Sequence, residues 1–204
     1  KLSEIAKPNV GIITNIGSAH AAKFIDPKNI AKEKSDIFSY FNEKSIAIIP
    51  FETKYYKLIS KKASKKTKRI YSFGQNKNCD FRIITPEESV SKLMIIDEEF
   101  NFKKNVSLSN KEENIIIILG LAKILKIKIK NILQLILKLK PIDGRGKKFL
   151  IKYKKKSFTL IDESYNSSPE SLVKAIENLK NFKSNHIRKI CVIGDMLELG
   201  KMSK

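Results

Sequence analysis

Residues 10–24, Val-Gly-Ile-Ile-Thr-Asn-Ile-Gly-Ser-Ala-His-Ala-Ala-Lys-Phe, contain an apolar run that breaks at Asn15 into a loop of small residues. The loop carries His20, one of only two histidines in the chain. A strand that ends in such a loop is typical of open α/β sheets, which bind ligands at the carboxyl ends of their strands. His20 would act there as a metal ligand or an acid–base group. Taken alone, a single histidine is more often a surface or capping residue.

The next segment, Ile30-Ala-Lys-Glu-Lys-Ser-Asp-Ile-Phe38, follows Asp26-Pro27 and is predicted to be helical. Lys34 stands four residues before Phe38. Without other information, Lys34 would be an ordinary exposed helix lysine, and Lys32 would be its equal. Its place after the loop of His20 gives it a possible role at the same site.

Together the two segments resemble the Mur ligase family, which uses ATP to make amide bonds in peptidoglycan precursors. In that family a strand ends in Asn-Ile-x-x-x-His, and the helix that follows has a lysine four residues before a phenylalanine. This chain has Asn15-Ile16-Gly17-Ser18-Ala19-His20, followed by Lys34 and Phe38. The resemblance runs in order along nearly the whole chain and is weakest in residues 54–110.

Two later segments resemble one branch of the family, the ligases that join D-alanyl-D-alanine to UDP-N-acetylmuramoyl-tripeptide. They are Leu160-Ile-Asp-Glu-Ser-Tyr-Asn-Ser-Ser-Pro169 and Val192-Ile-Gly-Asp-Met-Leu-Glu-Leu-Gly200. The family members that add the first, second and third residues differ at both places. A folylpolyglutamate synthase or the ligase that adds the third residue is the alternative within the superfamily, and the same two segments argue against it.

The composition is that of a globular protein with a large positive net charge. The 204 residues are 42% hydrophobic, which is ample for a core. The net charge of +20 would ordinarily suggest a nucleic acid or an anionic membrane surface as partner. The lysines are spread along the chain and accompany abundant isoleucine and asparagine, a bias that an AT-rich genome imposes on any protein. We therefore expect no nucleic-acid partner and interpret residues 61–69, the densest basic run, as a solvated helix end.

Cysteine usage and hydropathy predict a cytoplasmic protein. Cys79 and Cys191 lie far apart, cannot form a CxxC site, and are both expected to be reduced, with Cys191 buried in a strand. No segment has the roughly 18 uninterrupted apolar residues of a membrane span, so no membrane insertion is expected. We expect the full-length protein to be a monomer.

Hydrophobic patterning predicts an α/β fold with a largely parallel sheet covered by helices on both faces. Strands are expected at residues 10–14, 45–50 and 69–73, and helices at 28–40 and 53–64. Residues 81–85 and 93–96 are expected to form an antiparallel extension. Residues 111–125 are too apolar for a surface helix and are expected to be a buried one, followed by a second helix at 131–139.

The segment Pro141-Ile-Asp-Gly-Arg-Gly146 interrupts this pattern and predicts a domain boundary. After it, strands are expected at residues 149–153, 158–162 and 189–194, with a helix at 169–182 that Ser168 would cap. The resemblance implies that residues 1–142 are the back half of the family's central ATPase domain. Residues 143–204 would be the start of a Rossmann-like C-terminal domain.

The sequence contains no G-x-x-x-x-G-K-(S/T) phosphate loop. The family places that loop upstream of the point that corresponds to Lys1, together with the substrate-binding domain and an acidic magnesium ligand. We therefore expect the chain to be truncated at both ends and to be inactive by itself.

The resemblance also implies the chemistry and the residues that perform it. ATP would phosphorylate the tripeptide carboxylate, and the amine of D-alanyl-D-alanine would attack the acyl phosphate to leave an amide. Catalysis of this kind rests on positioning and on charge neutralisation. His20 would help ligate Mg²⁺, although magnesium ordinarily prefers oxygen ligands. Lys34 would be carbamylated, which turns a cation into a carboxylate-like magnesium ligand.

The remaining site residues would bind the nucleotide. Asn114 would lie near the adenine, with Asn110 as the alternative, and either could be only a helix cap. Arg145 would be an interdomain arginine that reaches an ATP phosphate, a contact to which a guanidinium is well suited. Asp162, Tyr165 and Asn166 would line the nucleotide and incoming-amine side of the cleft, or would form a simple Asx-type turn into the next helix.

Overall fold

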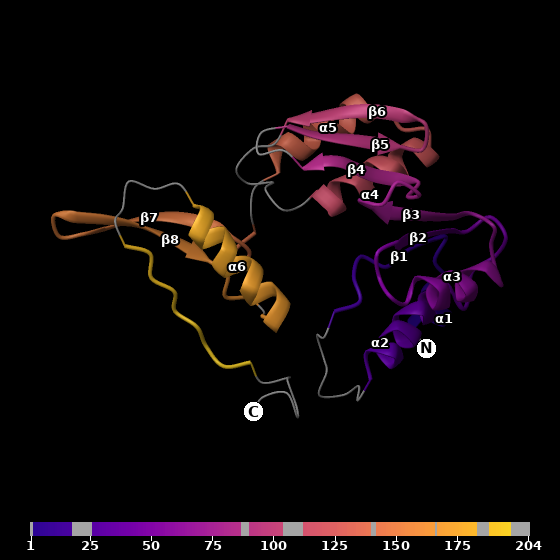
Figure 1. The fold of residues 1–204 in the computed structure, drawn as a ribbon, viewed down its shortest axis with the longest axis horizontal. Coiled ribbons are helices and arrows are strands. Elements are labelled where there is room, and N and C mark those ends of the chain that lie inside the picture. Colours follow the sequence, from indigo (N-terminus) through magenta and orange to yellow (C-terminus); the bar gives the residue numbers. More distant parts are fainter. Residues whose placement is uncertain are drawn as a thin grey trace. The chain divides into compact units, whose positions relative to one another are not determined.

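The computed structural model describes residues 2–17, 26–86, 90–103, 112–139, 142–165, 167–182 and 188–196. The chain divides into two compact units, Lys1–Ile16 with Asp26–Leu139, and Gly17–Ile25 with Lys140–Lys204. The elements of the first unit (Figure 1) are α1 (Leu2–Ala6), β1 (Val10–Ile12), α2 (Pro27–Lys34), the short 3-10 helix η1 (Ser35–Phe38), β2 (Ile46–Pro50), α3 (Tyr56–Ser64), β3 (Ile70–Gly74), β4 (Phe81–Pro86), β5 (Val90–Ile95), β6 (Glu98–Lys103), α4 (Glu112–Ile124) and α5 (Ile129–Lys138).

A six-stranded sheet in the order β1-β2-β3-β4-β5-β6 forms the centre of the first unit. The pairs from β1 to β4 are parallel, and the pairs β4-β5 and β5-β6 are antiparallel. This confirms the predicted α/β fold with a largely parallel sheet and an antiparallel extension. The parallel strands therefore end at one edge, which is where β1 delivers Asn15.

Both faces of the sheet are covered, as continuous apolar strands require. In β2 the side chains alternate, so that Ile46 and Ile48 join one core cluster and Ala47 and Ile49 join the other. The first cluster includes residues of α4 and α5, and the second includes residues of η1 and α3. The predicted helices therefore fix β1 and β2 from both sides.

Helix α4 is the buried helix that its composition predicts. Ile115, Ile116 and Leu119 are at most 3% exposed, whereas Ile118 faces outward. Gly120 lets α4 approach β4 closely, because a Cβ atom on this glycine would lie 2.4 Å from Cε2 of the Phe81 ring. The close approach seats α4 on the sheet.

The prediction missed two elements, α1 and β6. Strand β6 has the sequence Glu-Glu-Phe-Asn-Phe-Lys, and only its two phenylalanines belong to or pack on the core. An edge strand of this kind has a weak apolar pattern, because one face and one edge meet water. The antiparallel extension therefore has one strand more than predicted.

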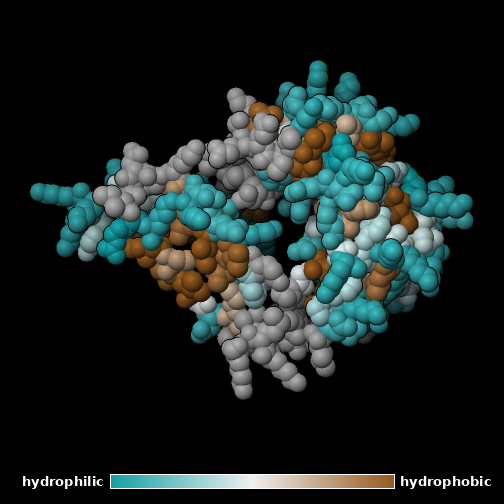
Figure 2. All heavy atoms as spheres, in the orientation of Figure 1, coloured by the Kyte–Doolittle hydropathy of each residue, from teal (hydrophilic) through white to brown (hydrophobic). Residues whose placement is uncertain are grey.

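The second unit contains β7 (Lys147–Tyr153), β8 (Lys156–Asp162) and α6 (Pro169–Asn181). The two strands form an antiparallel pair whose open end joins Lys147 to Asp162. Ser168 caps α6, as predicted, and its side chain accepts a hydrogen bond from the Ser171 N–H. A hairpin and one helix cannot bury both of their faces. Among its residues, Leu150, Phe158, Leu160, Val173 and Ile176 are exposed. Figure 2 shows an apolar patch on one face of this unit.

The predicted strand at residues 189–194 is wrong, because residues 188–196 contain no strand. A strand needs a neighbour for its backbone N–H and C=O groups. Among the described residues β8 pairs only with β7, and this segment has no partner. Cys191 is consequently exposed instead of buried. Both cysteines are free, as predicted, and burial raises the pKa of the Cys79 thiol to about 12.

Candidate functional site

The carboxyl end of β1 and the end of α2 meet in the first unit. The Ile13 N–H continues the pairing with β2 by donating to the Ile48 carbonyl. Beyond it, the Lys34 Nζ donates a hydrogen bond of 2.8 Å to the Asn15 carbonyl oxygen. The structure thus brings together two residues that stand 19 positions apart. His20 lies outside the described residues.

Helix α2 begins and ends in a way that fixes Lys34. The Asp26 side chain caps the helix by accepting from the Lys28 N–H, and Pro27 occupies the first turn. Lys34 is the last residue of α2, and η1 follows with Phe38 fully buried between the sheet and α3. The four-residue spacing from Lys34 to Phe38 therefore places a lysine at the edge of the sheet by anchoring a phenylalanine in the core.

Burial lowers the pKa of the Lys34 amine below its ordinary value. Desolvation acts in this direction because it disfavours the charged form of a lysine. A lowered pKa gives a larger neutral fraction at a given pH, and only the neutral amine is a nucleophile. Lys34 is therefore better suited to covalent modification than a lysine in water.

The side chains that the structure describes at this edge of the sheet do not by themselves provide a magnesium site. Among the described residues, no group of three or more His, Cys, Asp and Glu side chains could hold a metal ion. An unmodified ammonium at Lys34 does not fit a divalent cation, whereas a carbamate on the same nitrogen would offer the oxygen ligands that magnesium prefers. The fit to magnesium at this edge thus depends on modification of Lys34.

Glu52, which the sequence interpretation missed, lies at the neighbouring carboxyl ends of β2 and β3. Its Oε1 accepts hydrogen bonds of 2.7 Å from the backbone N–H groups of Gln75 and Asn76. Gly74, with φ +150°, makes room for it, because a Cβ atom there would lie 1.8 Å from Oε2 of Glu52. The glycine at the end of a predicted strand was the only signal in the sequence. The contact joins the loop after β2 to the loop after β3.

Asn114 lies in the first turn of α4, where its side chain is exposed. It is the third residue of the helix and does not belong to the core clusters. Asn110, the alternative residue, lies outside the described part of the chain.

The second unit brings Arg145, Asp162 and Tyr165 together at the open end of the β7–β8 hairpin. The Gly144 N–H donates to Oδ2 of Asp162 at 3.1 Å, and the Tyr165 N–H donates to the Gly144 carbonyl at 3.2 Å. The Arg145 guanidinium carbon lies 4.5 Å from the centre of the Tyr165 ring. Asn166 lies outside the described residues.

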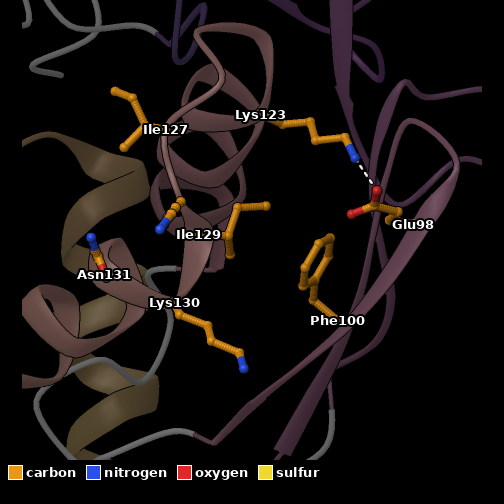
Figure 3. A pocket seen from close by; sticks show the side chains of 8 residues that line it. Glu98, Phe100, Lys123, Ile127, Ile129, Lys130 and Asn131 are labelled. Atoms are coloured by element: carbon orange, nitrogen blue, oxygen red, sulfur yellow. Dashed lines mark hydrogen bonds and ion pairs between the residues drawn. The ribbon is translucent and has the colours of Figure 1, made fainter.

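Two surface depressions are present away from these residues. One, of about 400 Å³, lies between β6, the end of α4 and the start of α5, where Phe100, Ile127 and Ile129 line it and Lys123 pairs with Glu98 (Figure 3). The other, of about 350 Å³, lies between α2 and α3. Its lysines are Lys32, Lys61, Lys62, Lys65 and Lys66. Neither contains a predicted site residue.

Comparisons with known proteins find relatives over nearly the whole chain. The Mur ligase middle domain matches residues 1–122. The UDP-N-acetylmuramoyl-tripeptide–D-alanyl-D-alanine ligase of Rickettsia prowazekii is 32% identical over 209 residues, which cover 98% of this chain and 44% of that protein. The ligase of the same name from Bacillus subtilis is 25% identical, and the aligned region covers 100% of this chain and 43% of that protein.

The fold is similar to a solved structure described as MurF from Acinetobacter baumannii. The TM-score is 0.82 at 24% sequence identity, and the match covers 98% of this chain and 43% of that one. The chain thus spans less than half the length of the relatives it matches. No helix of the described residues is long and apolar enough to cross a membrane.

Proposed function

Because this chain belongs to the Mur ligase family, we propose that it supplies part of an ATP-dependent ligase that adds D-alanyl-D-alanine to UDP-N-acetylmuramoyl-tripeptide. The observation that carries the proposal is the pairing of Lys34 with Asn15 at the carboxyl end of β1. This is the position at which open α/β sheets bind ligands. Relatives aligned with 98% of the chain are named as ligases of this specificity.

The first group of proposed site residues is Asn15, His20 and Lys34. The Asn15 carbonyl holds the Lys34 nitrogen by a hydrogen bond. The lowered pKa of Lys34 favours its reaction with carbon dioxide, which would leave a carbamate beside the loop of His20. Bound ATP and magnesium would supply the phosphoryl group and the neutralising charge. Lys34 and His20 would hold the magnesium.

The second group of proposed site residues lies on the pair of loops in the second unit. Arg145 would contact an ATP phosphate, and its guanidinium fits that task because it presents its donors as a planar fork. Asp162, Tyr165 and Asn166 are proposed to belong to the same loop set, and Asn114 to lie near the adenine. We propose that the ligase acts in the cytoplasm as a monomer.

A fusion protein tests the proposal. The chain would be joined to the upstream part of the Rickettsia prowazekii relative, which by family resemblance carries the phosphate loop. We expect ADP release that requires both UDP-N-acetylmuramoyl-tripeptide and D-alanyl-D-alanine. His20→Ala and Lys34→Ala should abolish this release, and Lys32→Ala, one helical turn or less away, should retain it.

The chain by itself provides the companion measurement. We expect the 204 residues alone neither to hydrolyse ATP nor to form the amide, since the phosphate loop is absent from this sequence. Ligation by the chain alone, or full activity of the fusion with Lys34→Ala, would contradict the proposed division of roles.

A further inference from the structure

The open end of the β7–β8 hairpin ties the turn at residues 142–146 to the loop at residues 163–165. The Gly146 N–H donates to the Asp162 carbonyl at 2.8 Å, and the Tyr165 N–H donates to the Gly144 carbonyl at 3.2 Å. Gly144 has φ +74°, and a Cβ atom on it would lie 2.8 Å from the Tyr165 Cβ. The turn that carries Arg145 therefore packs directly against the backbone that carries Tyr165.

The carboxylate of Asp162 is committed to this junction. Its Oδ1 accepts from the Ser164 N–H at 3.0 Å and from the Ser164 hydroxyl at 2.6 Å, and its Oδ2 accepts from the Gly144 N–H at 3.1 Å. These hydrogen bonds, chiefly those from Ser164, hold the pKa of Asp162 below its ordinary value. Three protein donors on one carboxylate indicate a group that holds the chain together.

The Arg145 guanidinium lies over the Tyr165 ring. The guanidinium carbon lies 4.5 Å from the ring centre, a distance typical of a cation–π contact. A guanidinium that lies parallel to a ring keeps its N–H donors, which lie in its own plane, available to a ligand. Among the described residues, no carboxylate forms an ion pair with Arg145.

We propose that Asp162 and Tyr165 are positioning residues for Arg145, with Asp162 fixing the two loops to each other and the Tyr165 ring holding the guanidinium so that its N–H edge faces an oxyanion. The oxyanion would be a phosphate of the nucleotide, and this identification rests on the proposed function. In this arrangement Asp162 and Tyr165 act through Arg145 and do not themselves contact the nucleotide.

Nuclear magnetic resonance on the 204-residue chain tests the arrangement without any ligand. The ring current of Tyr165 should shift the Arg145 side-chain protons upfield. Tyr165→Leu and Asp162→Ala should each remove that shift, and Tyr165→Phe should restore it because the ring remains. Asp143→Asn is the matched control, since Asp143 lies in the same turn but pairs with Lys147. Persistence of the shift in Asp162→Ala would overturn the proposal.

Acidification gives a second signature. The pKa of Asp162 is lowered in the folded chain. The hydrogen bonds to its carboxylate are therefore present at neutral pH and are lost only below the ordinary aspartate pKa of about 3.9. Lys147, Arg145, Asp143 and Glu163 are the other charged groups at this end of the hairpin. The Arg145 shift should still disappear on acidification in Asp143→Asn and in Glu163→Gln, because both variants keep the Asp162 carboxylate. A shift that persists at acid pH in either variant would count against Asp162.

A double-mutant cycle in the fusion ligase separates positioning from the proposed function. Arg145→Ala should lower kcat/KM for ATP by about tenfold or more, since it removes hydrogen bonds to a charged group. Asp162→Ala should also lower it, but should add nothing in the Arg145→Ala background. Additive losses would overturn the positioning role. An unchanged kcat/KM in Arg145→Ala would instead refute the phosphate contact in the proposed function, and the resonance experiment would still decide the positioning role.

Discussion

The amine of Lys34 is the residue on which the proposed chemistry depends. Its hydrogen bond to the Asn15 carbonyl fixes the nitrogen, and burial lowers its pKa. The neutral amine can attack the carbon of carbon dioxide, and loss of its proton leaves a carbamate. Because the pKa of Lys34 is lowered in the folded chain, its neutral fraction rises at a lower pH than for an ordinary lysine, whose pKa is about 10.4. The rate of carbamate formation should rise with this neutral fraction.

Labelled bicarbonate would reveal this modification in the chain alone. We expect a ¹³C carbamate signal at mildly alkaline pH that Lys34→Arg removes, because arginine stays protonated and cannot react. Lys32→Arg is the control, since Lys32 lies on the same helix, whereas the hydrogen bond to the Asn15 carbonyl comes from Lys34. A signal that survives Lys34→Arg would assign the reactive amine to another lysine.

Single residues differed in how far the sequence could reveal them. Lys34 was found because its spacing to Phe38 is a local pattern, and the structure shows that this pattern couples the helix end to a core anchor. Glu52 could not be found in this way. Its partners, Gln75 and Asn76, are 23 and 24 residues away, and they are backbone N–H groups that any residue would offer. The roles of His20, Lys34, Asn114, Arg145, Asp162, Tyr165 and Asn166 stay predictions.

At the scale of elements, burial decided what could be predicted. The strands β1, β2 and β3 and the helices α3 and α4 have strong apolar patterns, and each was expected within a few residues of its observed bounds. Strand β6 was missed because its pattern is that of an edge. The strand expected at residues 189–194 has the right composition, but composition alone cannot supply the neighbour that a strand needs.

Helix α4 offers the sharpest test of packing in the first unit. Gly120→Ala would place a Cβ atom 2.4 Å from a ring atom of Phe81, which is fully buried. Overpacking costs about 1–3 kcal/mol, and the gain in helix propensity is at most about 1 kcal/mol. We therefore expect a lower free energy of unfolding, by about 1 kcal/mol, in urea denaturation.

The double variant Gly120→Ala with Phe81→Leu is the control for this clash. Phe81→Leu removes the ring, so Gly120→Ala should no longer cause the clash. The loss of unfolding free energy in the double variant should therefore be clearly smaller than the sum of the losses in the two single variants. Gly194→Ala, where nothing lies within 4 Å, should leave stability unchanged. Full additivity in the double variant would show that the Gly120→Ala effect has another origin than the Phe81 ring.

On the scale of the whole molecule, the excess of positive charge is the feature that most invites a different function. The net charge is +20, and five lysines surround the depression between α2 and α3. Only Lys62 among them forms an ion pair with a described residue, Asp36. The other lysines of the chain lie on many elements of both units. This distribution gives general attraction to polyanions.

Filter binding of duplex DNA at two salt concentrations distinguishes this general attraction from a nucleic-acid function. If the five lysines contacted five phosphates, the logarithm of affinity would fall with the logarithm of salt with a slope of about −4.5. We expect weak retention at low salt and almost none at physiological salt, since salt screens a general electrostatic attraction. The triple variant Lys61→Glu, Lys65→Glu, Lys66→Glu should reduce the low-salt retention no more than three charge reversals elsewhere, for example at Lys128, Lys130 and Lys138. Tight retention at physiological salt that only the first triple variant abolishes would assign a nucleic-acid site to the α2–α3 face and would weaken the case for a ligase.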